Sequence, residues 1–494
     1  MEILIQENTE AAYRDAAHLT GQSTVAMESV VPDTKDDIGR ILSVRPALFL
    51  KSRELNGRSV TVRAQASVGI VYLNAAENAV EAFPAGQDFS ISFDLPPEAE
   101  EDALTQVTLG ICGVQTRVLN SRKLSIELET VCELFACARQ SYADSQCLPE
   151  DCPVTIHVLE EETRAELLAG IYEKAVTFSE QFEISEAEDT PAEIVWMEPN
   201  MHFEDRQIIG SRLLLKGEVA LTLDYLPEGR AVPKRKTLRL PFSQLIDLEN
   251  ESAQQAAARL TWTHCSHELV SSVEGRKLLN VDLRGLLSVR TTRETTVHSI
   301  ADAYCNSMPC SCRWEPDTLP PLAETKTIRL TGEDSVELPE DYREMLISYQ
   351  TPGNCSAAQG TALVEMLCAD SENRLLVIRR IVALSAAEET DALAAASCRI
   401  TEFSAFREGD QLILRLAAEA EGTHTESRPL KRLRSLALDE SRAYDRSASP
   451  ALTAVWAETE TVWELAKLYR STPEAIEALN EDLTKNPVFI PDMP

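Results

Sequence analysis

Apolar and polar residues alternate along short stretches through most of the chain, and this alternation predicts β-strands. In one stretch Val60, Val62 and Ala64 alternate with Thr61 and Arg63, and the segments FSISFDL and KLSIEL repeat the pattern. A period of two places one set of side chains on a buried face and the other in solvent. Turns are supplied by the segment YLPEG and by glycines at positions 57, 210 and 275. We therefore predict antiparallel β-sandwich or barrel-like domains.

An internal repeat relates two parts of the chain. The segment NGRSVTVRAQASVGIVYL aligns without a gap on IGSRLLLKGEVALTLDYL, which brings Gly57 onto Gly210 and Tyr72 onto Tyr225. The same register matches FSISFDL to FSQLIDL and, after one inserted residue, SRKLSIEL to GRKLLNVDL. A repeat of roughly 150 residues is a whole domain and too long for a solenoid unit. We predict that residues 20–140 and 178–295 share one fold.

These patterns divide most of the chain into β domains and connecting segments. We expect β domains at 1–140, 178–297 and 313–445. The third is a diverged copy, because it has the strand-like segment QLILRLAAEA after a Gly-Asp turn but lacks the Arg-Lys pair of the first two. Segment LEEETRAELLAGIYEKAV predicts a helical linker over 141–177, and the segment CNSMPCSC marks a cysteine-containing linker over 298–312.

The hydrophobic pattern changes to a helical period in the last segment, residues 450–494. One apolar helix face is predicted from residues at positions i, i+3, i+4 and i+7, namely Val462, Leu465, Ala466 and Tyr469. Thr461 and Glu464 form a capping box before this helix, and a second helix runs from Pro473 to Asn480. Short β-prone runs stand at 452–456 and 488–490. The predicted fold class is mainly β, with a small α+β domain of order strand, helix, helix, strand.

This order of elements and its residues resemble the LysM domain. The matching positions are Thr459 to Val462, Leu465 with Ala466, Asn480, and Ile490 with Pro491. LysM domains commonly bind N-acetylglucosamine chains with backbone groups of two loops, which the resemblance implies for this segment. Here Thr459 replaces the first-loop glycine, and the second loop reads Lys485-Asn486-Pro487 with no glycine. This departure makes glycan binding doubtful and favours protein binding.

The first β domain opens with VVPDTKDDIGRILSV, and this stretch, the Gly-to-Tyr strand pair and the Phe-Ser block resemble the SPOCS domain of spore-forming Firmicutes. Tandem SPOCS-like domains before a LysM-like domain resemble the SipL-like family of spore coat morphogenetic proteins. The resemblance implies a non-enzymatic scaffold in spore coat and cortex assembly. It also implies a SpoIVA-like coat-basement ATPase as partner of the terminal domain, with other coat proteins as further candidates, in the mother-cell cytoplasm at the forespore surface.

We expect the partner-binding residues to lie on the first helix and the two loops of the LysM-like domain. They are Thr459, Glu460, Trp463, Lys467, Arg470, Lys485 and Asn486. Trp463 lies one residue, or about 100° of helix rotation, beyond Val462. Its indole is therefore expected at the edge of the apolar face, partly exposed and flanked by cations, as an interface anchor. Packing of Trp463 over the domain's own core is the equally weighted alternative.

Charge and composition narrow the classes of partner. The chain has 80 acidic and 47 basic residues and a net charge of −33. Such a chain repels nucleic acid and anionic lipid, so a protein partner is expected to offer a basic or neutral surface. No apolar run approaches the length of about 18 residues that a membrane span needs, and the N-terminal segment lacks a signal pattern. We therefore expect a cytoplasmic protein whose twelve cysteines are reduced.

The sequence lacks the common motifs of catalysis. A P-loop, a Gly-x-Ser-x-Gly elbow and an HExxH helix are absent. The segment THCSHEL at His264 is interpreted as a strand with polar residues outward, and Cys305, Cys310 and Cys312 as reduced thiols without a fourth ligand for zinc. We expect no enzyme activity, cofactor or metal. The competing hypotheses are a peptidoglycan-binding wall or cortex protein and an enzyme with a site built from distant residues.

Overall fold

A computed structural model describes residues 1–492, with short gaps. The residues outside the description are 78, 98, 100–102, 185–189, 229–232, 250, 251, 272–275, 340, 351–358, 373, 387–393, 446–449, 484, 493 and 494. Only the backbone is described for 318–326, 344–350, 394–399 and 421–428. Gly275, predicted as a turn residue, is one of the residues outside the description.

The first unit is a six-stranded β-sandwich. Its strands are β2 (Gln6–Val30), β3 (Ile38–Asn56), β4 (Ser59–Asn74), β5 (Val80–Asp94), β6 (Leu104–Asn120) and β7 (Lys123–Cys147). The middle strands form the meander β3-β4-β5, while the first strand β2 pairs with the last strand β7, which also pairs with β6. The predicted alternation supplies the core, because Ile70 and Tyr72 of β4 pack in one cluster with Leu124 and Ile126 of β7.

The second unit repeats this strand order. Its strands are β8 (Ile156–Glu183), β9 (Pro191–Ile209), β10 (Arg212–Pro227), β11 (Lys234–Asp247), β12 (Gln255–Ser271) and β13 (Lys277–Cys305). The meander is β9-β10-β11, and β13 pairs with both β8 and β12. Gly57 lies in the turn between β3 and β4, and Gly210 lies in the turn between β9 and β10, with φ of 61° and 59°. The prediction that the two repeats share one fold is confirmed by these matching strand orders.

The third unit repeats the chain order of the strands, but a short strand pairing joins its meander to its first and last strands. Its strands are β14 (Cys310–Glu337), β15 (Arg343–Gln350), β16 (Gln359–Ala369), β17 (Leu375–Ala386), β18 (Ala394–Glu408) and β19 (Gln411–Leu438). The meander β15-β16-β17 continues through β17 into β14, and β19 pairs with both β14 and β18, so this unit forms one continuous sheet. A short strand, β1 (Glu2–Leu4), pairs with β19 and ties the start of the chain to this unit.

Two predicted linkers are wrong. The segment expected to be helical, within 141–177, instead belongs to β7 and β8, and β8 pairs with β13 over its whole length. Its Glu, Ala and Leu residues favour helix, but local propensity is weaker than an uninterrupted tertiary ladder. The expected cysteine linker at 298–312 holds the end of β13 and the start of β14, and only a few residues between Cys305 and Cys310 connect the two strands.

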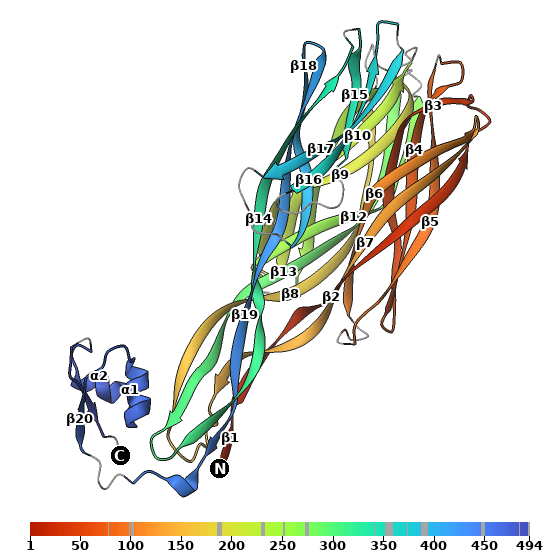
Figure 1. The fold of residues 1–494 in the computed structure, drawn as a ribbon. Helices are drawn as coiled ribbons and strands as arrows, with labels where there is room; N and C mark the ends of the chain where they lie inside the picture. The colour runs from red at the N-terminus through yellow and green to blue at the C-terminus, as the bar shows by residue number, and fades with distance from the viewer. Residues whose placement is uncertain are drawn as a thin grey trace.

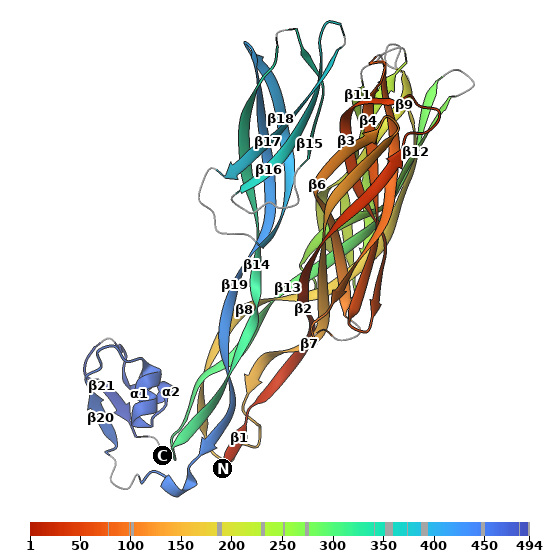
Figure 2. The ribbon, with the colours of Figure 1, turned by 45° about the vertical axis from the view of Figure 1, so that its right-hand side comes forward.

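The first and last strands of each unit extend past the sandwiches and form a common stalk (Figure 1). These six strands are 25 to 29 residues long, far beyond the usual length of about five or six. Ile3, Ile300, Leu433 and Leu436 form the apolar core at the lower end of the stalk. In Figure 2 the third unit stands to the left of the other two, and all three meet the stalk from above.

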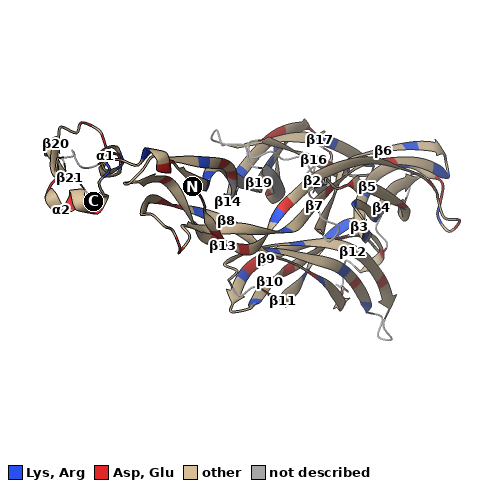
Figure 3. Ribbon diagram, turned by 90° about the horizontal axis from the view of Figure 1, so that it is seen from below, with Lys and Arg blue, Asp and Glu red and all other residues tan. Residues whose placement is uncertain are grey.

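The meander sheets of the three units meet in one apolar seam. Val71 of the first unit, Val195 and Leu226 of the second, and Leu367 and Leu375 of the third belong to one buried cluster. Because this cluster contains residues from every unit, the three units are packed against one another. Charged residues of both signs are spread along the strands around it (Figure 3).

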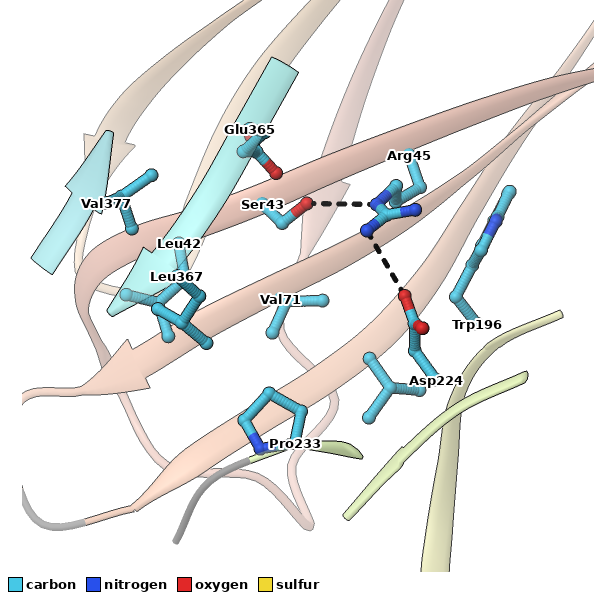
Figure 4. Close-up of a pocket in the computed structure, with 11 residues that line it drawn as sticks. Leu42, Ser43, Arg45, Val71, Trp196, Asp224, Pro233, Glu365, Leu367 and Val377 are labelled. Carbon is cyan, nitrogen blue, oxygen red and sulfur yellow. Dashed lines mark hydrogen bonds and ion pairs between the residues drawn. The ribbon is translucent and has the colours of Figure 1, made fainter. Parts of the chain in front are cut away.

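A buried ion pair crosses the same seam (Figure 4). Arg45 Nη2 lies 3.2 Å from Asp224 Oδ2, and the side chains of both residues are less than a tenth exposed. Arg235 donates to both oxygens of Asp224 at 2.7 and 2.9 Å. Beside the pair, Gly69 lies flat against Trp196, so that a Cβ at position 69 would be 2.3 Å from the indole ring. Arg45, Asp224 and Trp196 line a cavity of about 20 Å³, which is enough for one water molecule.

A small α+β domain stands beside the lower end of the stalk. It follows a short 3₁₀ helix (Glu440–Arg442) and contains β20 (Leu452–Val455), α1 (Val462–Tyr469), α2 (Pro473–Leu479) and β21 (Val488–Pro491). Strands β20 and β21 pair antiparallel. The predicted order of strand, helix, helix, strand is present, and the mainly β fold class with a small α+β domain is confirmed.

Candidate partner-binding site

Local sequence signals fix the helices of the terminal domain. Thr461 Oγ1 accepts a hydrogen bond from the Glu464 N–H at 3.2 Å, and Glu464 Oε2 accepts one from the Thr461 N–H at 2.7 Å, so the predicted capping box is present. Thr472 caps α2, and Pro473 occupies its first turn. Both helices bury their apolar faces against β21. Ile476 of α2 belongs to the core that they form.

Helix α1 is docked against the end of strand β13 in the stalk. Trp463 Nε1 donates to Asp302 Oδ2 at 2.9 Å, and Lys467 Nζ lies 2.7 Å from both oxygens of the same carboxylate. The Trp463 ring meets Tyr304 edge-on with centroids 4.9 Å apart, and the Tyr304 hydroxyl donates to the Ser471 carbonyl at 2.8 Å. We call this set of contacts the stalk–domain contact.

Asp302 is the charged centre of the stalk–domain contact. Burial opposes its ionisation, but hydrogen bonds from Lys467, Trp463 and the Ala303 N–H outweigh burial and hold the pKa of this carboxyl below its ordinary value. The ionised form of Asp302 is therefore the form that the docked domain stabilises.

Three of the seven predicted partner-binding residues contact the stalk or the segment that leads from it to the terminal domain. Trp463 lies at the edge of the α1 apolar face and is half-buried, as expected from its helical position, but it faces the stalk. Lys467 forms the ion pair with Asp302. The guanidinium of Arg470, which ends α1 in the left-handed conformation, stacks over the Tyr444 ring at 3.4 Å from its centroid.

The other four predicted residues lie together on two adjoining loops. Asn486 Oδ1 accepts from the Ala457 N–H at 2.9 Å and its Nδ2 donates to the Ala457 carbonyl at 2.8 Å, which ties the second loop to the first. Thr459, Glu460 and Lys485 are exposed around this link. The N–H of Glu460 itself and those of the two preceding residues bond its carboxylate and hold the pKa of Glu460 below its ordinary value.

An exposed apolar surface on the terminal domain was not predicted. Leu452, Ala454 and Trp456 lie along β20 and just after it, and Phe489 stands opposite Ala454 on β21. Leu452 is 50% exposed, Trp456 71% and Phe489 40%. We call these four residues the outer sheet face. In Figure 1, β20 lies on the far side of the domain from the stalk, whereas α1 lies toward it.

The strand register explains why this surface is turned outward. Val455 pairs with Val488 and Thr453 with Ile490, and Val488 and Ile490 are buried under the two helices. Side chains of a strand alternate between faces, so the residues between these positions point to solvent. The alternation at 452–456 was visible in the sequence, but it does not say which face is covered. The available signal for an exposed apolar face was the run Val488, Phe489 and Ile490, which places apolar residues on both faces of β21.

Other residues singled out in the sequence have ordinary surroundings. His264 and Cys265 are adjacent residues of β12, and His264 Nε2 lies 3.0 Å from the Ser266 hydroxyl. Burial raises the pKa of the Cys265 thiol to about 12, which makes it a poor nucleophile. Within the described part of the chain, His, Cys, Asp and Glu side chains form no group of three or more that could hold a metal ion. None of the helices among the described residues is long and apolar enough to cross a membrane.

No family model, curated protein or solved structure matches the chain.

Proposed function

We propose that the chain is a non-enzymatic scaffold in spore coat and cortex assembly that holds a SpoIVA-like basement ATPase at the forespore surface in the mother-cell cytoplasm. The observation that carries this proposal is the orientation of the terminal domain. Its helix α1 is fixed to the stalk through Asp302, while the outer sheet face points away. The domain is thus held against the stalk with its apolar outer sheet face exposed.

The chemistry of this surface suits a protein partner. An exposed tryptophan beside a phenylalanine and a leucine is the kind of aromatic anchor that dominates protein interfaces. The loop residues Thr459, Glu460, Lys485 and Asn486 supply polar groups elsewhere on the same domain. Because the chain carries a net charge of −33, the partner surface is expected to be basic or neutral around its apolar centre.

The loop geometry counts against the peptidoglycan alternative. A LysM-like domain would bind the glycan with backbone groups of its two loops, but here the Asn486 side chain already occupies the N–H and carbonyl of Ala457. Pro487, which follows Asn486, has no N–H to offer. These contacts leave the two loops with fewer free backbone donors and acceptors, which supports a protein partner over a glycan.

Direct binding tests separate the two functions. The full-length chain is expected to bind the purified basement ATPase from the same cells in a biosensor assay, and to remain in the supernatant when peptidoglycan is sedimented. Binding to peptidoglycan without binding to the ATPase would reject the proposed function and select the glycan alternative.

A further inference from the structure

Two cysteines at the base of the stalk form a pair that the proposed function does not use. Cys310 and Cys312 are separated by one residue on β14, so both side chains leave the same face of the strand. Their sulfur atoms lie 3.8 and 3.7 Å from one carbonyl oxygen, that of Ala303 on β13. Two thiols are thus held against the same point of a neighbouring strand.

The pair lies where the stalk and the terminal domain meet. Cys310 packs against the stalk core, with Leu436 and Leu438, and also against the core of the terminal domain, with Leu465. Both cysteines are partly accessible to solvent. A small reagent can therefore reach these thiols, although Cys310 also contacts the cores of both the stalk and the terminal domain.

The surroundings of Cys310 favour its thiolate. A hydrogen bond from the Cys312 thiol, assisted by the Cys305 N–H and by the Lys467 ammonium, outweighs burial and the nearby Asp302 carboxylate and lowers the pKa of Cys310 to about 7. The pKa of Cys312 is raised by the same hydrogen bond.

Four other cysteines have a raised pKa, in contrast to Cys310. Burial raises the pKa of Cys132, Cys137 and Cys265 to about 12. The pKa of the exposed Cys112 is also raised, by burial and by Glu129. A thiolate, not a thiol, is the nucleophile, so these four are poorly activated at neutral pH.

We propose that Cys310 and Cys312 are a reactive dithiol that a hydroperoxide converts to a disulfide at the stalk–domain contact. The Cys310 thiolate attacks the terminal oxygen of the peroxide and the O–O bond breaks, which gives a sulfenic acid and releases hydroxide from hydrogen peroxide or an alkoxide from an alkyl hydroperoxide. Cys312 then attacks the sulfenic sulfur, its S–O bond breaks, and the hydroxyl group leaves as water with the thiol proton. The two sulfurs lose two electrons and the peroxide gains them.

The strand geometry permits the product. Residues two apart on an extended strand have Cα atoms roughly 6.6 Å apart, which is within the upper part of the disulfide range. Cys305 is the other candidate for the second sulfur, because it lies in the same stalk core. Its thiol, however, is directed to the Ser307 hydroxyl at 3.1 Å.

The test uses the full-length protein and one equivalent of hydrogen peroxide, followed by alkylation and peptide mass spectrometry. The expected product is a Cys310–Cys312 disulfide that forms before Cys112 or Cys147, both exposed, is modified. The disulfide should persist in Cys305→Ser, and Cys312→Ser should leave a sulfenic acid at Cys310 that dimedone traps. First oxidation at Cys112 or Cys147, or a Cys305–Cys310 disulfide, would overturn the proposal.

A second readout keeps the test independent of the oxidant. The alkylation rate of Cys310 by iodoacetamide should rise with pH to a midpoint near 7, below the midpoint of Cys112, whose pKa is raised by burial and by Glu129. In Cys312→Ser the serine hydroxyl can partly replace the hydrogen bond to Cys310, whereas Cys312→Ala removes this bond. The alkylation midpoint of Cys310 should therefore shift upward most in Cys312→Ala. Equal midpoints for Cys310 and Cys112 would contradict the proposed activation.

Discussion

Asp302 joins two segments that are about 160 residues apart in sequence, because it binds Trp463 and Lys467 of α1 from the end of β13. Its pKa is held below the ordinary carboxyl value of 3.8 by these partners. A depressed folded-state pKa stabilises the contact above the unfolded value and the stabilisation is lost as pH falls through the folded value. We therefore predict that the stalk–domain contact is intact at neutral pH and weakens below about pH 4.

Acid titration of the full chain followed by tryptophan fluorescence measures this weakening. The change below pH 4 should be smaller in Asp302→Asn, because that variant has no carboxylate left to protonate at the contact. An identical acid transition in wild type and Asp302→Asn would show that Asp302 does not control docking.

The indole N–H of Trp463 gives a second prediction at the scale of one residue. Trp463→Phe keeps an aromatic ring against Tyr304 but removes the hydrogen bond to Asp302. A hydrogen bond to a charged group is worth about 1.5 to 3 kcal/mol, and the partial exposure of this site favours the lower end. Hydrogen exchange of the α1 amides should therefore quicken about tenfold, with exchange in β4 unchanged as the internal control. Unchanged exchange in α1 would remove Trp463 from the docking contact.

At the scale of elements, the two repeat hairpins test the backbone argument for glycine. Gly57 and Gly210 have φ near +60°, and a Cβ at either position would meet no atom within 4 Å. Alanine there should cost about 1 to 2 kcal/mol through backbone conformation alone, and asparagine should cost less. Gly86→Ala in β5 is the matched control, since its added Cβ makes only an ordinary contact. Urea unfolding that ranks the control variant as the least stable would contradict this account.

The elements also show what the sequence could and could not predict. Strands were predictable because alternation is local, and the terminal helices because capping by Thr461 and Thr472 is local. The segment over β8 was mistaken for helix because its composition favours helix, while pairing with β13 depends on residues more than a hundred positions away. The stalk was missed for the same reason.

Prediction of the candidate site had a similar limit. Helical spacing placed Trp463 correctly at the edge of the α1 apolar face, but it could not identify Asp302 and Tyr304 as the groups that cover it. The alternation around Trp456 predicted a strand, but the free face of that strand depends on where the two helices pack. Surfaces are decided by tertiary contacts, which a pattern along one segment does not contain.

At the scale of the whole molecule, a buried ion pair joins the first and second units within the seam. Asp224 balances Arg45 and Arg235. Asp224→Ala leaves Arg45 buried without its counter-charge, which typically costs about 3 to 5 kcal/mol. We predict a clear loss of thermal stability, whereas Asp247→Ala, which removes an exposed partner of Arg212, should change little. Equal melting temperatures for the two variants would show that the seam does not need this pair.

We propose that the outer sheet face of the terminal domain binds a coat-basement ATPase. The most direct measurement compares the dissociation constants of three full-length proteins for that purified ATPase. They are wild type, a variant with Trp456→Ala and Phe489→Ala, and the control Ile381→Ala, which truncates an apolar side chain 72% exposed on the third unit. We predict that the double variant binds about thirtyfold more weakly, which corresponds to about 2 kcal/mol, and that the control binds like wild type. Equal binding by all three proteins, with the double variant shown by circular dichroism to be folded, would contradict the account.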